Sequence, residues 1–372
     1  MRKLTGKAAA FFRSQPVLAI SFLAAAATMF AVPPDSAYKG YCSRTVLIQL
    51  FALMTAVTGL RSVGVFDAAT RFILKKAGNV RALGRVFILV CFFASMLVTN
   101  DVALLAFVPL TILIFQGNSD EKSRIMVIVL ETAAANLGSM MTPIGNPQNL
   151  FLYDEYGLTA LDFIKATLPF GAISIFCLMG LSFLLPKTPC KAPADSEGDI
   201  IARKCAVYTV LFAVCLCSVL RLVPDYVCLI AAVAAAAVCD IAILKKVDYA
   251  LLATFVCFFV FVGNIARIGA VNDFFRDILS GREILVSVGL SQLISNVPAA
   301  VMLAGFTDNG KALLVGVDIG GLGTMIASLA SLISFQIYRK SEGARPGRYM
   351  LTFSLMSIAM LAVLLPAALL IT

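Results

Sequence analysis

The sequence predicts an all-α polytopic membrane protein of about nine transmembrane helices and two re-entrant helical hairpins, in two inverted-topology repeats. Three observations predict this fold class: the composition, the polar residues that interrupt apolar runs, and short motifs that recur in both halves. Of the 372 residues, 60% are hydrophobic and 14% are charged, whereas a soluble domain is about half apolar and about a quarter charged. With a mean hydropathy of +0.94, the chain is expected to lie in a membrane.

The same composition argues against an enzyme. The chain contains no histidine, which is the commonest general base and the commonest metal ligand, and it has no hydrophilic stretch long enough for a soluble catalytic domain. The sequence therefore predicts no cofactor and no transition-metal site. The net charge of +9 lies mostly in short loops between apolar runs, which is typical of topology signals and not of a nucleic-acid surface.

Nine apolar segments are long enough to cross a bilayer, at about 20 residues for each span. They are about 15–32, 44–60, 125–150, 167–185, 205–222, 226–244, 248–264, 312–337 and 350–371. Two of them contain polar or helix-breaking residues, so that 125–150 and 312–337 are predicted to be broken helices.

Two further apolar runs are predicted to be hairpins that enter and leave the membrane on one side. As one helix, 86–115 would be about 45 Å long against a hydrocarbon core of about 30 Å, and as two crossings its arms of about 20 Å would be too short. Its midpoint is the polar triplet Thr99-Asn100-Asp101. The run 284–306 has Ser295-Asn296-Val297-Pro298 at its centre, where proline breaks the helix.

The distribution of basic residues supports both hairpins. If both are re-entrant and the N-terminus is cytoplasmic, most of the 30 Lys and Arg residues lie inside, including the basic loop 339–348, as the positive-inside rule requires. The C-terminus then lies outside. This orientation fits a multi-pass protein of the plasma (inner) membrane.

The two halves of the chain repeat three motifs in the same order. Residues 1–186 form the predicted N-terminal repeat, 187–204 a cytoplasmic linker and 205–372 the C-terminal repeat. The matches are 59–67 with 263–273, 99–101 with 295–297, and 136–141 with 321–326. An odd number of crossings separates the copies, so the second is inverted, and inverted repeats with interrupted helices are typical of secondary transporters, whose site lies near the midplane.

The hairpin tips and helix breaks are therefore the candidate site, because irregular backbone at membrane depth is tolerated where it lines a cavity or is buried in protein. Freed N–H groups suit an anion, and freed carbonyls and hydroxyls suit Na⁺. The predicted substrate-binding residues are Asn100, Asn296, Ser139, Thr324 and Asn146. The predicted ion-binding or coupling residues are Thr99, Asp101, Glu131, Gly138, Thr142, Gly145, Ser295, Gly321 and Gly323.

Each of these residues also has a structural interpretation. Glycines such as Gly138 serve close helix packing, and Asn100 or Asn296 could join helices by hydrogen bonds. A charged Asp at the bilayer centre costs about 2.5–3.5 kcal/mol, so Asp101 and Glu131 are the leading proton carriers or cation ligands. Asp318 is a third candidate, with a solvated helix end as its alternative interpretation.

The first hairpin tip and the run from Ala135 to Pro147, which includes Thr142-Pro143-Ile144-Gly145-Asn146-Pro147, resemble the ion transporter superfamily. This group holds citrate-transporter-like permeases, divalent-anion:sodium symporters, arsenite-efflux permeases and a sodium/proton antiporter family. The resemblance implies a mobile transport domain that moves elevator-fashion against a scaffold. In the dicarboxylate branch both tips resemble Ser-Asn-Thr, whereas this chain has Asp101 and Val297 at the third positions. That difference favours a resemblance to the arsenite-permease-like branch over the dicarboxylate branch.

The sequence thus predicts a secondary active transporter of a small anion, coupled to Na⁺ or H⁺. A cation/proton antiporter of the same fold and an arsenite-type efflux permease stay open as alternatives, and a passive channel or an intramembrane enzyme is less favoured. The expected partners are the lipid bilayer and a small anionic solute, without nucleic acid, and a homodimer stays open.

Overall fold

The structure is a computed structural model that describes residues 16–65, 78–115, 121–189 and 202–372. Every regular element in these ranges is a helix, and six of the helices are long and apolar enough to cross a membrane. The predicted fold class, an all-α polytopic membrane protein, is confirmed. The basic N-terminal segment and most of the predicted linker 187–204 lie outside the described residues.

The helices of the first half follow the predicted order of spans, hairpin and broken helix. They are α2 (Pro16–Ala31), η1 (Ser36–Gly40), α3 (Arg44–Ser62), α5 (Val80–Val98), α6 (Asn100–Phe115), α7 (Glu121–Ser139), α8 (Pro147–Glu155), α9 (Ala160–Leu181) and η2 (Ser182–Leu184). The break between α7 and α8 covers residues 140–146.

The second half contains a hairpin and a broken helix of the same kind. Its elements are α10 (Ala202–Val219), α11 (Asp225–Cys239), η3 (Ile241–Lys246), α12 (Tyr249–Ala266), α13 (Gly269–Leu279), α14 (Glu283–Ile294), α15 (Asn296–Ala304), α16 (Gly310–Ile319), α17 (Leu329–Arg339) and α18 (Pro346–Ile371). The break between α16 and α17 covers 320–328, within the predicted broken helix 312–337. The repeat boundaries themselves stay a prediction.

Each hairpin turns on a single residue with a positive φ. Thr99 has φ 70° and ψ 149° between α5 and α6, and Ser295 has φ 78° and ψ 154° between α14 and α15. Positive φ is uncommon for residues other than glycine, and costs about 1–3 kcal/mol when the surroundings enforce it. The two tips therefore share one strained conformation at matching positions of the two motifs.

The first hairpin is longer than its apolar run indicates. Helix α5 begins at Val80, six residues before the expected start, and its 19 residues measure about 28 Å, which corrects the arm of about 20 Å that the hydropathy predicts. The added residues include Arg81, whose Nε donates to the carbonyl of Leu185 at 2.7 Å, and Arg85, whose guanidinium lies 4.3 Å from the ring centroid of Phe183. Arginine can keep its charge at such an interface while its stem covers apolar surface.

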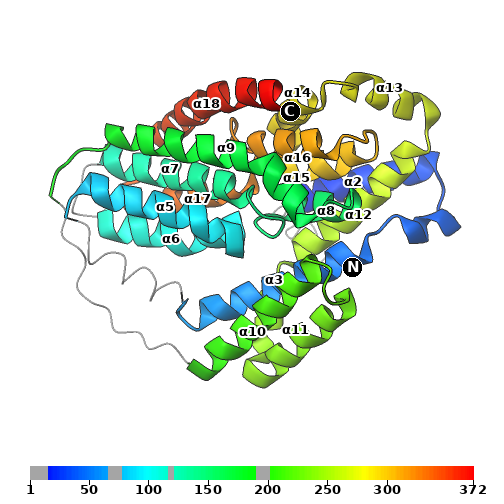
Figure 1. Cartoon of the computed structure of the whole chain (residues 1–372), viewed down its shortest axis with the longest axis horizontal. Coiled ribbons are helices and arrows are strands. Elements are labelled where there is room, and N and C mark those ends of the chain that lie inside the picture. The colour runs from blue at the N-terminus through cyan, green and yellow to red at the C-terminus, as the bar shows by residue number, and fades with distance from the viewer. Residues whose placement is uncertain (1–15, 66–77, 116–120, 190–201) are drawn as a thin grey trace, which may run out of the picture.

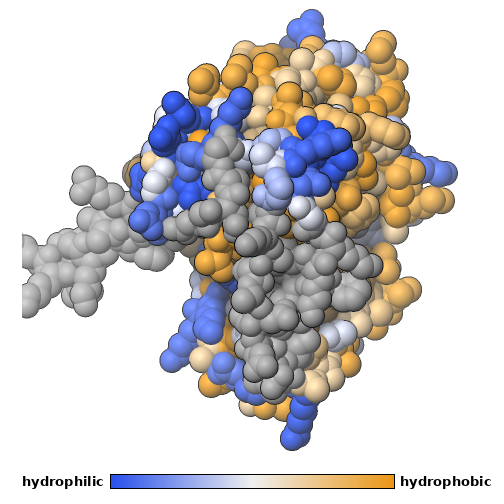
Figure 2. Space-filling model, turned by 90° about the vertical axis from the view of Figure 1, so that its left-hand side faces the viewer, coloured by the Kyte–Doolittle hydropathy of each residue, from blue (hydrophilic) through white to orange (hydrophobic). Residues whose placement is uncertain are grey.

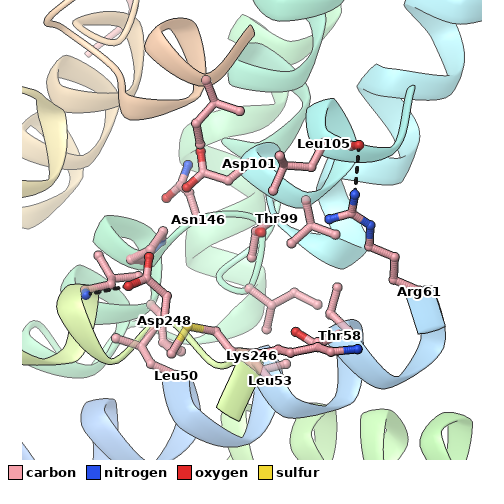
Figure 3. A pocket seen from close by; sticks show the side chains of 18 of the residues that line it. Leu50, Leu53, Thr58, Arg61, Thr99, Asp101, Leu105, Asn146, Lys246 and Asp248 are labelled. Atoms are coloured by element: carbon pink, nitrogen blue, oxygen red, sulfur yellow. Dashed lines mark hydrogen bonds between the residues drawn. The ribbon is translucent and has the colours of Figure 1, made fainter. Parts of the chain in front are cut away.

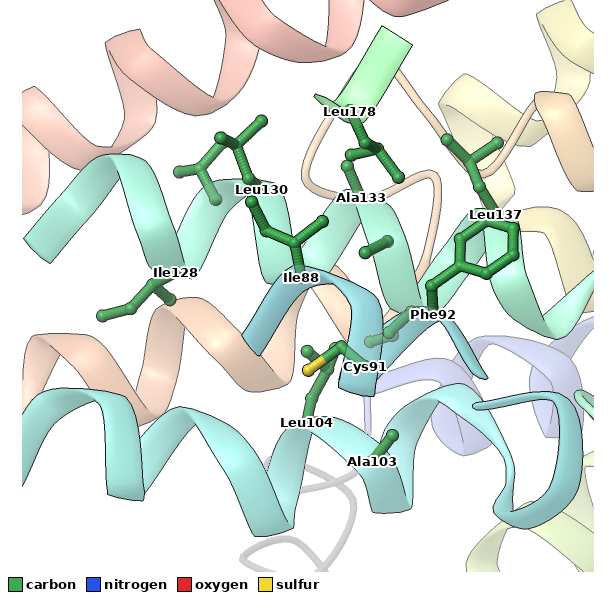
Figure 4. Close-up of a cluster of buried hydrophobic side chains, with 14 of the residues drawn as sticks. Ile88, Cys91, Phe92, Ala103, Leu104, Ile128, Leu130, Ala133, Leu137 and Leu178 are labelled. Carbon is green, nitrogen blue, oxygen red and sulfur yellow. The ribbon is translucent and has the colours of Figure 1, made fainter. Parts of the chain in front are cut away.

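The helices form two groups in Figure 1. Helices α9, α7, α5 and α6 are stacked side by side with α18 above them, whereas α3, α10 and α11 pack together lower in the view. Figure 4 shows the core of the first group, in which Ile88, Cys91 and Phe92 of α5 lie between Leu104 of α6 and Leu137 of α7.

The outer surface carries large apolar side chains. Phe30 is 90% exposed, Phe176 78% and Leu370 87%, and Figure 2 shows hydrophobic residues over much of one side of the molecule. Contiguous exposed apolar surface of this kind is rare in soluble monomers and is expected where helices face lipid.

Two arginines at the ends of matching helices are anchored to the protein. Arg61 donates to the carbonyl of Leu105 at 3.1 Å. Arg267 bonds Asp35 at 2.7 Å, and this bond lowers the pKa of the Asp35 carboxyl. Helix α13, which follows Arg267, was not predicted as a separate element.

Candidate functional site

Both hairpin tips are bonded to the helix break of their own half. The backbone N–H of Asn100 donates to the carbonyl of Gly145 at 3.1 Å, and that of Asn296 donates to the carbonyl of Ala327 at 2.9 Å. In both tips the asparagine Oδ1 accepts from the next backbone N–H, at 2.9 Å from Asp101 and 3.0 Å from Val297. The predicted juxtaposition of tips and breaks is therefore present, with the same local geometry twice.

Asn136 joins the first tip to the second break. Its Oδ1 accepts from Nδ2 of Asn100 at 3.1 Å and from Oγ of Ser328 at 2.9 Å. Its Nδ2 donates to Oγ of Ser331 at 3.2 Å. The residue is 5% exposed and was not among the predicted site residues, although it stands two positions before Gly138 in a repeated motif.

The first break is held together by asparagine side chains. Oδ1 of Asn146 caps α8 by accepting from the N–H of Asn149 at 2.9 Å, and Nδ2 of Asn146 donates to Oγ of Ser139 at 3.2 Å. Gly145 is required by close packing, because a Cβ there would lie 2.1 Å from the Ser139 carbonyl oxygen. Of the predicted residues, Ser139, Gly145 and Asn146 are thus brought together.

Asp318, the third candidate, belongs to the same cluster, and its alternative interpretation as a solvated helix end is wrong. Its Oδ1 accepts from Asn146 at 3.3 Å and from Gln148 at 3.2 Å, and the side chain is 2% exposed. The polar residues Asp308 and Lys311 mark the beginning of α16, whereas Asp318 lies at its other end, which runs into the interior.

The second break is clamped by Gln292 of α14. Its Nε2 donates to the carbonyls of Gly320 and Leu322, both at 2.9 Å, and its Oε1 accepts from the N–H of Thr324 at 2.8 Å. Gly323 has φ +109°, and a Cβ there would lie 2.3 Å from that Oε1. Thr324 is exposed, and its hydroxyl donates to the backbone carbonyl of Gln292. It is therefore not brought to the cluster of Ser139, Asn146 and Asp318.

A cavity of about 500 Å³ opens beside the first tip. Its walls come from α3, the tip, the first break, and the segment that leads into α12. The charged residues that line it are Arg61, Asp101, Lys246 and Asp248. Thr99, Asp101 and Asn146 border the cavity together in Figure 3, whereas Asn100 turns to Asn136.

The remaining predicted residues do not line the cavity. Glu131 accepts from the hydroxyl of Thr111 at 2.5 Å between α6 and α7, and it does not line the cavity. Thr142 donates to the carbonyl of Met96 at 2.5 Å. The other three serve the packing of the tips and breaks: Gly138 against α5, Gly321 beside the Asn296 amide, and Ser295 at the second turn.

A family model described as "Citrate transporter" matches residues 5–312 of the chain. An uncharacterized transporter of Methanocaldococcus jannaschii is 36% identical over 332 residues, which are 87% of this chain and 88% of that protein. A silicon efflux transporter of Oryza sativa is 29% identical over 182 residues, 47% of this chain and 36% of that protein. The solved YdaH transporter of Alcanivorax borkumensis shares the fold, with a TM-score of 0.63 and 13% identity over 90% of this chain and 87% of its own.

Proposed function

Because this chain belongs to the citrate transporter family and is a membrane transporter, not an enzyme, we propose that it is a secondary active transporter of a small anion, coupled to Na⁺ or H⁺. The resemblance to a wider transporter superfamily, inferred from the hairpin tip and the first break, agrees with this family. The substrate, the coupling ion and the elevator-type movement are the parts that we propose.

The joined tips and breaks are the observation that carries the proposal. Asn100 and Asn296 each bond a break, and Asn136 and Asp318 link the first tip and the two broken helices to each other. Interrupted helices present N–H groups and carbonyls to solutes and ions near the bilayer midplane. A substrate held here would contact the tips and broken helices of both halves of the chain. Its binding would therefore favour movement of these helices as one unit.

The cavity supports an anionic substrate and a direction of access. Two of its lining residues, Arg61 and Lys246, are basic, and basic side chains attract anions. Both residues are cytoplasmic in the predicted orientation, so the cavity would be the cytoplasmic access route. In the elevator we propose, α5–α9 and α14–α18 move against a scaffold that includes α3, α10 and α11.

Uptake into proteoliposomes tests the proposal. Purified protein is supplied with citrate, succinate, phosphate, arsenite or silicic acid while a Na⁺ gradient or a proton gradient is imposed separately. We expect saturable accumulation of one anion that follows one of the gradients. Transport that is indifferent to both gradients would contradict coupling.

Efflux of a small uncharged oxyacid is a second candidate function. It is favoured by the equal number of basic and acidic residues that line the cavity. Arg61 and Lys246 are matched by Asp101 and Asp248, so the lining carries no net formal charge. A relative of this chain is named a silicon efflux transporter. A neutral solute would be recognised by the amides and hydroxyls of the tip and would be indifferent to the basic residues.

Paired charge variants separate these candidates. In an anion transporter, Asp101→Asn should raise the apparent affinity for the anion roughly threefold or more, because it removes a repelling charge, and Lys246→Gln should lower it by a similar factor. For an uncharged oxyacid both variants should leave KM within about twofold. If Asp101→Asn instead abolishes proton-driven cation movement, the cation/proton antiporter is the correct function. The measurement is initial uptake against substrate concentration for each variant.

A further inference from the structure

One oxygen of the Asp318 carboxylate is buried without a hydrogen-bond partner. Oδ1 accepts from Asn146 and Gln148, whereas Oδ2 has no hydrogen-bond partner among the described residues. A buried ionised carboxylate is unfavourable unless a cation or hydrogen-bond donors compensate it. If Asp318 is ionised, Oδ2 therefore needs a cation or a hydrogen-bond donor that the described side chains do not provide.

A second unpartnered oxygen belongs to the same cluster. Asn149 is fully buried, and its Nδ2 donates to the carbonyls of Ser139 and Thr142, both at 3.2 Å. Its Oδ1 has no partner within the described part of the chain. The Asn149 side chain also lies close to the Asp318 carboxylate. The cluster thus contains two buried oxygen acceptors that lack a hydrogen-bond donor among the described residues.

The cluster suits a proton better than Na⁺. Hard cations are held by about six oxygen ligands, whereas the unpartnered buried oxygens of this cluster are Oδ2 of Asp318 and Oδ1 of Asn149. Asn146 and Gln148 present amide nitrogens, not oxygens, to the carboxylate. These N–H donors repel a metal cation from Oδ1 and leave Oδ2 free for a proton.

No charged side chain of the described residues neutralises Asp318. The elements packed against α16 are α7, α8, α9, α14, α15 and α18. Their titratable and charged groups, with that of α16 itself, are Glu121, Lys122, Arg124, Glu131, Tyr153, Asp154, Glu155, Asp162, Lys165, Cys177, Glu283, Lys311, Arg348 and Tyr349. The hydrogen bonds that the carboxylate accepts come from the uncharged amides of Asn146 and Gln148. Lys311 bonds Asp162 instead.

We propose that Asp318 binds the proton that is coupled to transport. In this step Oδ2 of the carboxylate takes H⁺ from water, an O–H bond forms, and the hydroxyl donates to Oδ1 of Asn149. Release breaks the same O–H bond and returns H⁺ to water on the other side, with no change of oxidation state. The inference rests on the proposed transport function and names its coupling ion and the residue that carries it.

The position of Asp318 explains how its charge could govern movement. The carboxylate comes from α16, and its amide partners come from the end of the first break and the first turn of α8, so protonation changes the bond between two broken helices. Asn146 also lines the cavity, which connects the proton site to the solute route. A neutral cluster can move through apolar surroundings that oppose an ionised one.

The other two candidate proton carriers, Asp101 and Glu131, lack this combination. Asp101 lines the cavity, and its backbone N–H, not its carboxylate, is bonded at the tip. Glu131 also has a buried oxygen without a hydrogen-bond partner among the described residues, Oε2, but its other oxygen bonds Thr111 between α6 and α7, and it does not join the two broken helices.

Infrared spectroscopy of the reconstituted full-length protein tests the site without a substrate. Near neutral pH the wild type should show a C=O stretching component of a protonated carboxylic acid that is absent from Asp318→Asn. Asparagine can keep every bond of the protonated acid, since its amide N–H can donate to Asn149, so this variant should fold.

Asn149→Ala should move the same C=O component to higher frequency, because the Asp318 hydroxyl loses its acceptor. Glu131→Gln, the matched buried acid, should remove a different component that Asn149→Ala does not move.

Two infrared outcomes would overturn the proposal. An Asp318→Asn spectrum identical to that of the wild type would show that Asp318 is ionised. Disappearance of the component on addition of NaCl would show that the site binds Na⁺. Because neither readout needs transport, a failure to find a transported solute would refute the proposed function and leave this inference to be judged separately.

Transport then tests the coupling. For the anion found in the uptake screen, Asp318→Asn should reduce accumulation driven by a pH gradient at least tenfold. Asn149→Ala should move the pH of half-maximal uptake to a lower value, which loss of structure alone would not do. Undiminished pH-driven accumulation by Asp318→Asn would contradict the assignment.

Discussion

Replacing Asn136 by alanine is expected to abolish transport and to destabilise the protein by about 3 kcal/mol or more. The substitution removes the partner of Nδ2 of Asn100 and of the hydroxyls of Ser328 and Ser331. Each buried polar group that is left unsatisfied costs about 1–3 kcal/mol. The same three bonds fix the first tip against the second broken helix, so their loss should disorder the proposed binding site itself.

The measurements are initial uptake into proteoliposomes and the midpoint of thermal unfolding in detergent. Gln49→Ala is the matched control, because Gln49 is also a buried amide that bonds across helices, to the carbonyl of Ser218 at 3.1 Å and its hydroxyl at 3.3 Å. It lies between α3 and α10, in the other helix group. We expect it to lower the midpoint while the folded fraction keeps the wild-type KM. Equal losses of transport per folded molecule in both variants would show that Asn136 acts through stability alone.

The hairpin tips could be predicted because their signal is local. A polar residue followed by asparagine interrupts each apolar run, at Thr99-Asn100 and at Ser295-Asn296. A turn of one residue between two helices needs only a backbone that accepts positive φ and an amide that bonds the freed N–H. These requirements are met within a few residues of the chain, where sequence patterns are informative.

Asp318 and Gln292 could not be placed in the same way, because their partners are distant in sequence. Asp318 bonds Gln148 of α8 and Asn146 of the first break, 170 and 172 residues away, and Gln292 bonds the second break, 28 to 32 residues away. Along the chain, Asp318 is another polar residue near a helix end, and burial of that end depends on how the broken helices cross. Thr324 shows the opposite error: it stands in a break, but the turn at Gly323 directs it outward.

Hydropathy also misjudges helix length where arginines lie at an interface. The apolar run begins after Arg85, whereas α5 already begins at Val80. The earlier start is possible because Arg85 stacks on the ring of Phe183 and Arg81 donates to the carbonyl of Leu185. A hydropathy average counts these side chains as breaks, although their charged ends reach polar or aromatic partners. This error does not change the predicted fold class, but it makes the predicted first hairpin too short.

Gly138→Ala is expected to have the largest effect of any single methyl group added to the described helices around the site. An ideal Cβ at Gly138 would lie 2.0 Å from the carbonyl oxygen of Phe92 and 2.6 Å from Oγ of Ser95. The first of these is a backbone atom, which cannot rotate away, so α5 must move from α7. Overpacking of a close-packed interior typically costs about 1–3 kcal/mol and occasionally more, and this contact belongs at the upper end. Because α5 carries the first tip, the same displacement should also stop transport.

Gly180→Ala is the matched control, since Gly180 lies in α9 and a Cβ there meets nothing within 4 Å. Because Gly180 is the second-last residue of α9, the added methyl group should stabilise the protein by less than in a helix interior, where the gain is about 0.5–1 kcal/mol. Thermal unfolding of both variants, with and without added Na⁺, separates the two interpretations of Gly138. If the residue serves helix packing, Gly138→Ala lowers the midpoint at every Na⁺ concentration. A variant with the wild-type midpoint that has lost only a Na⁺-dependent stabilisation would instead place Gly138 in an ion site, since the packing of α5 on α7 would then have tolerated the methyl group.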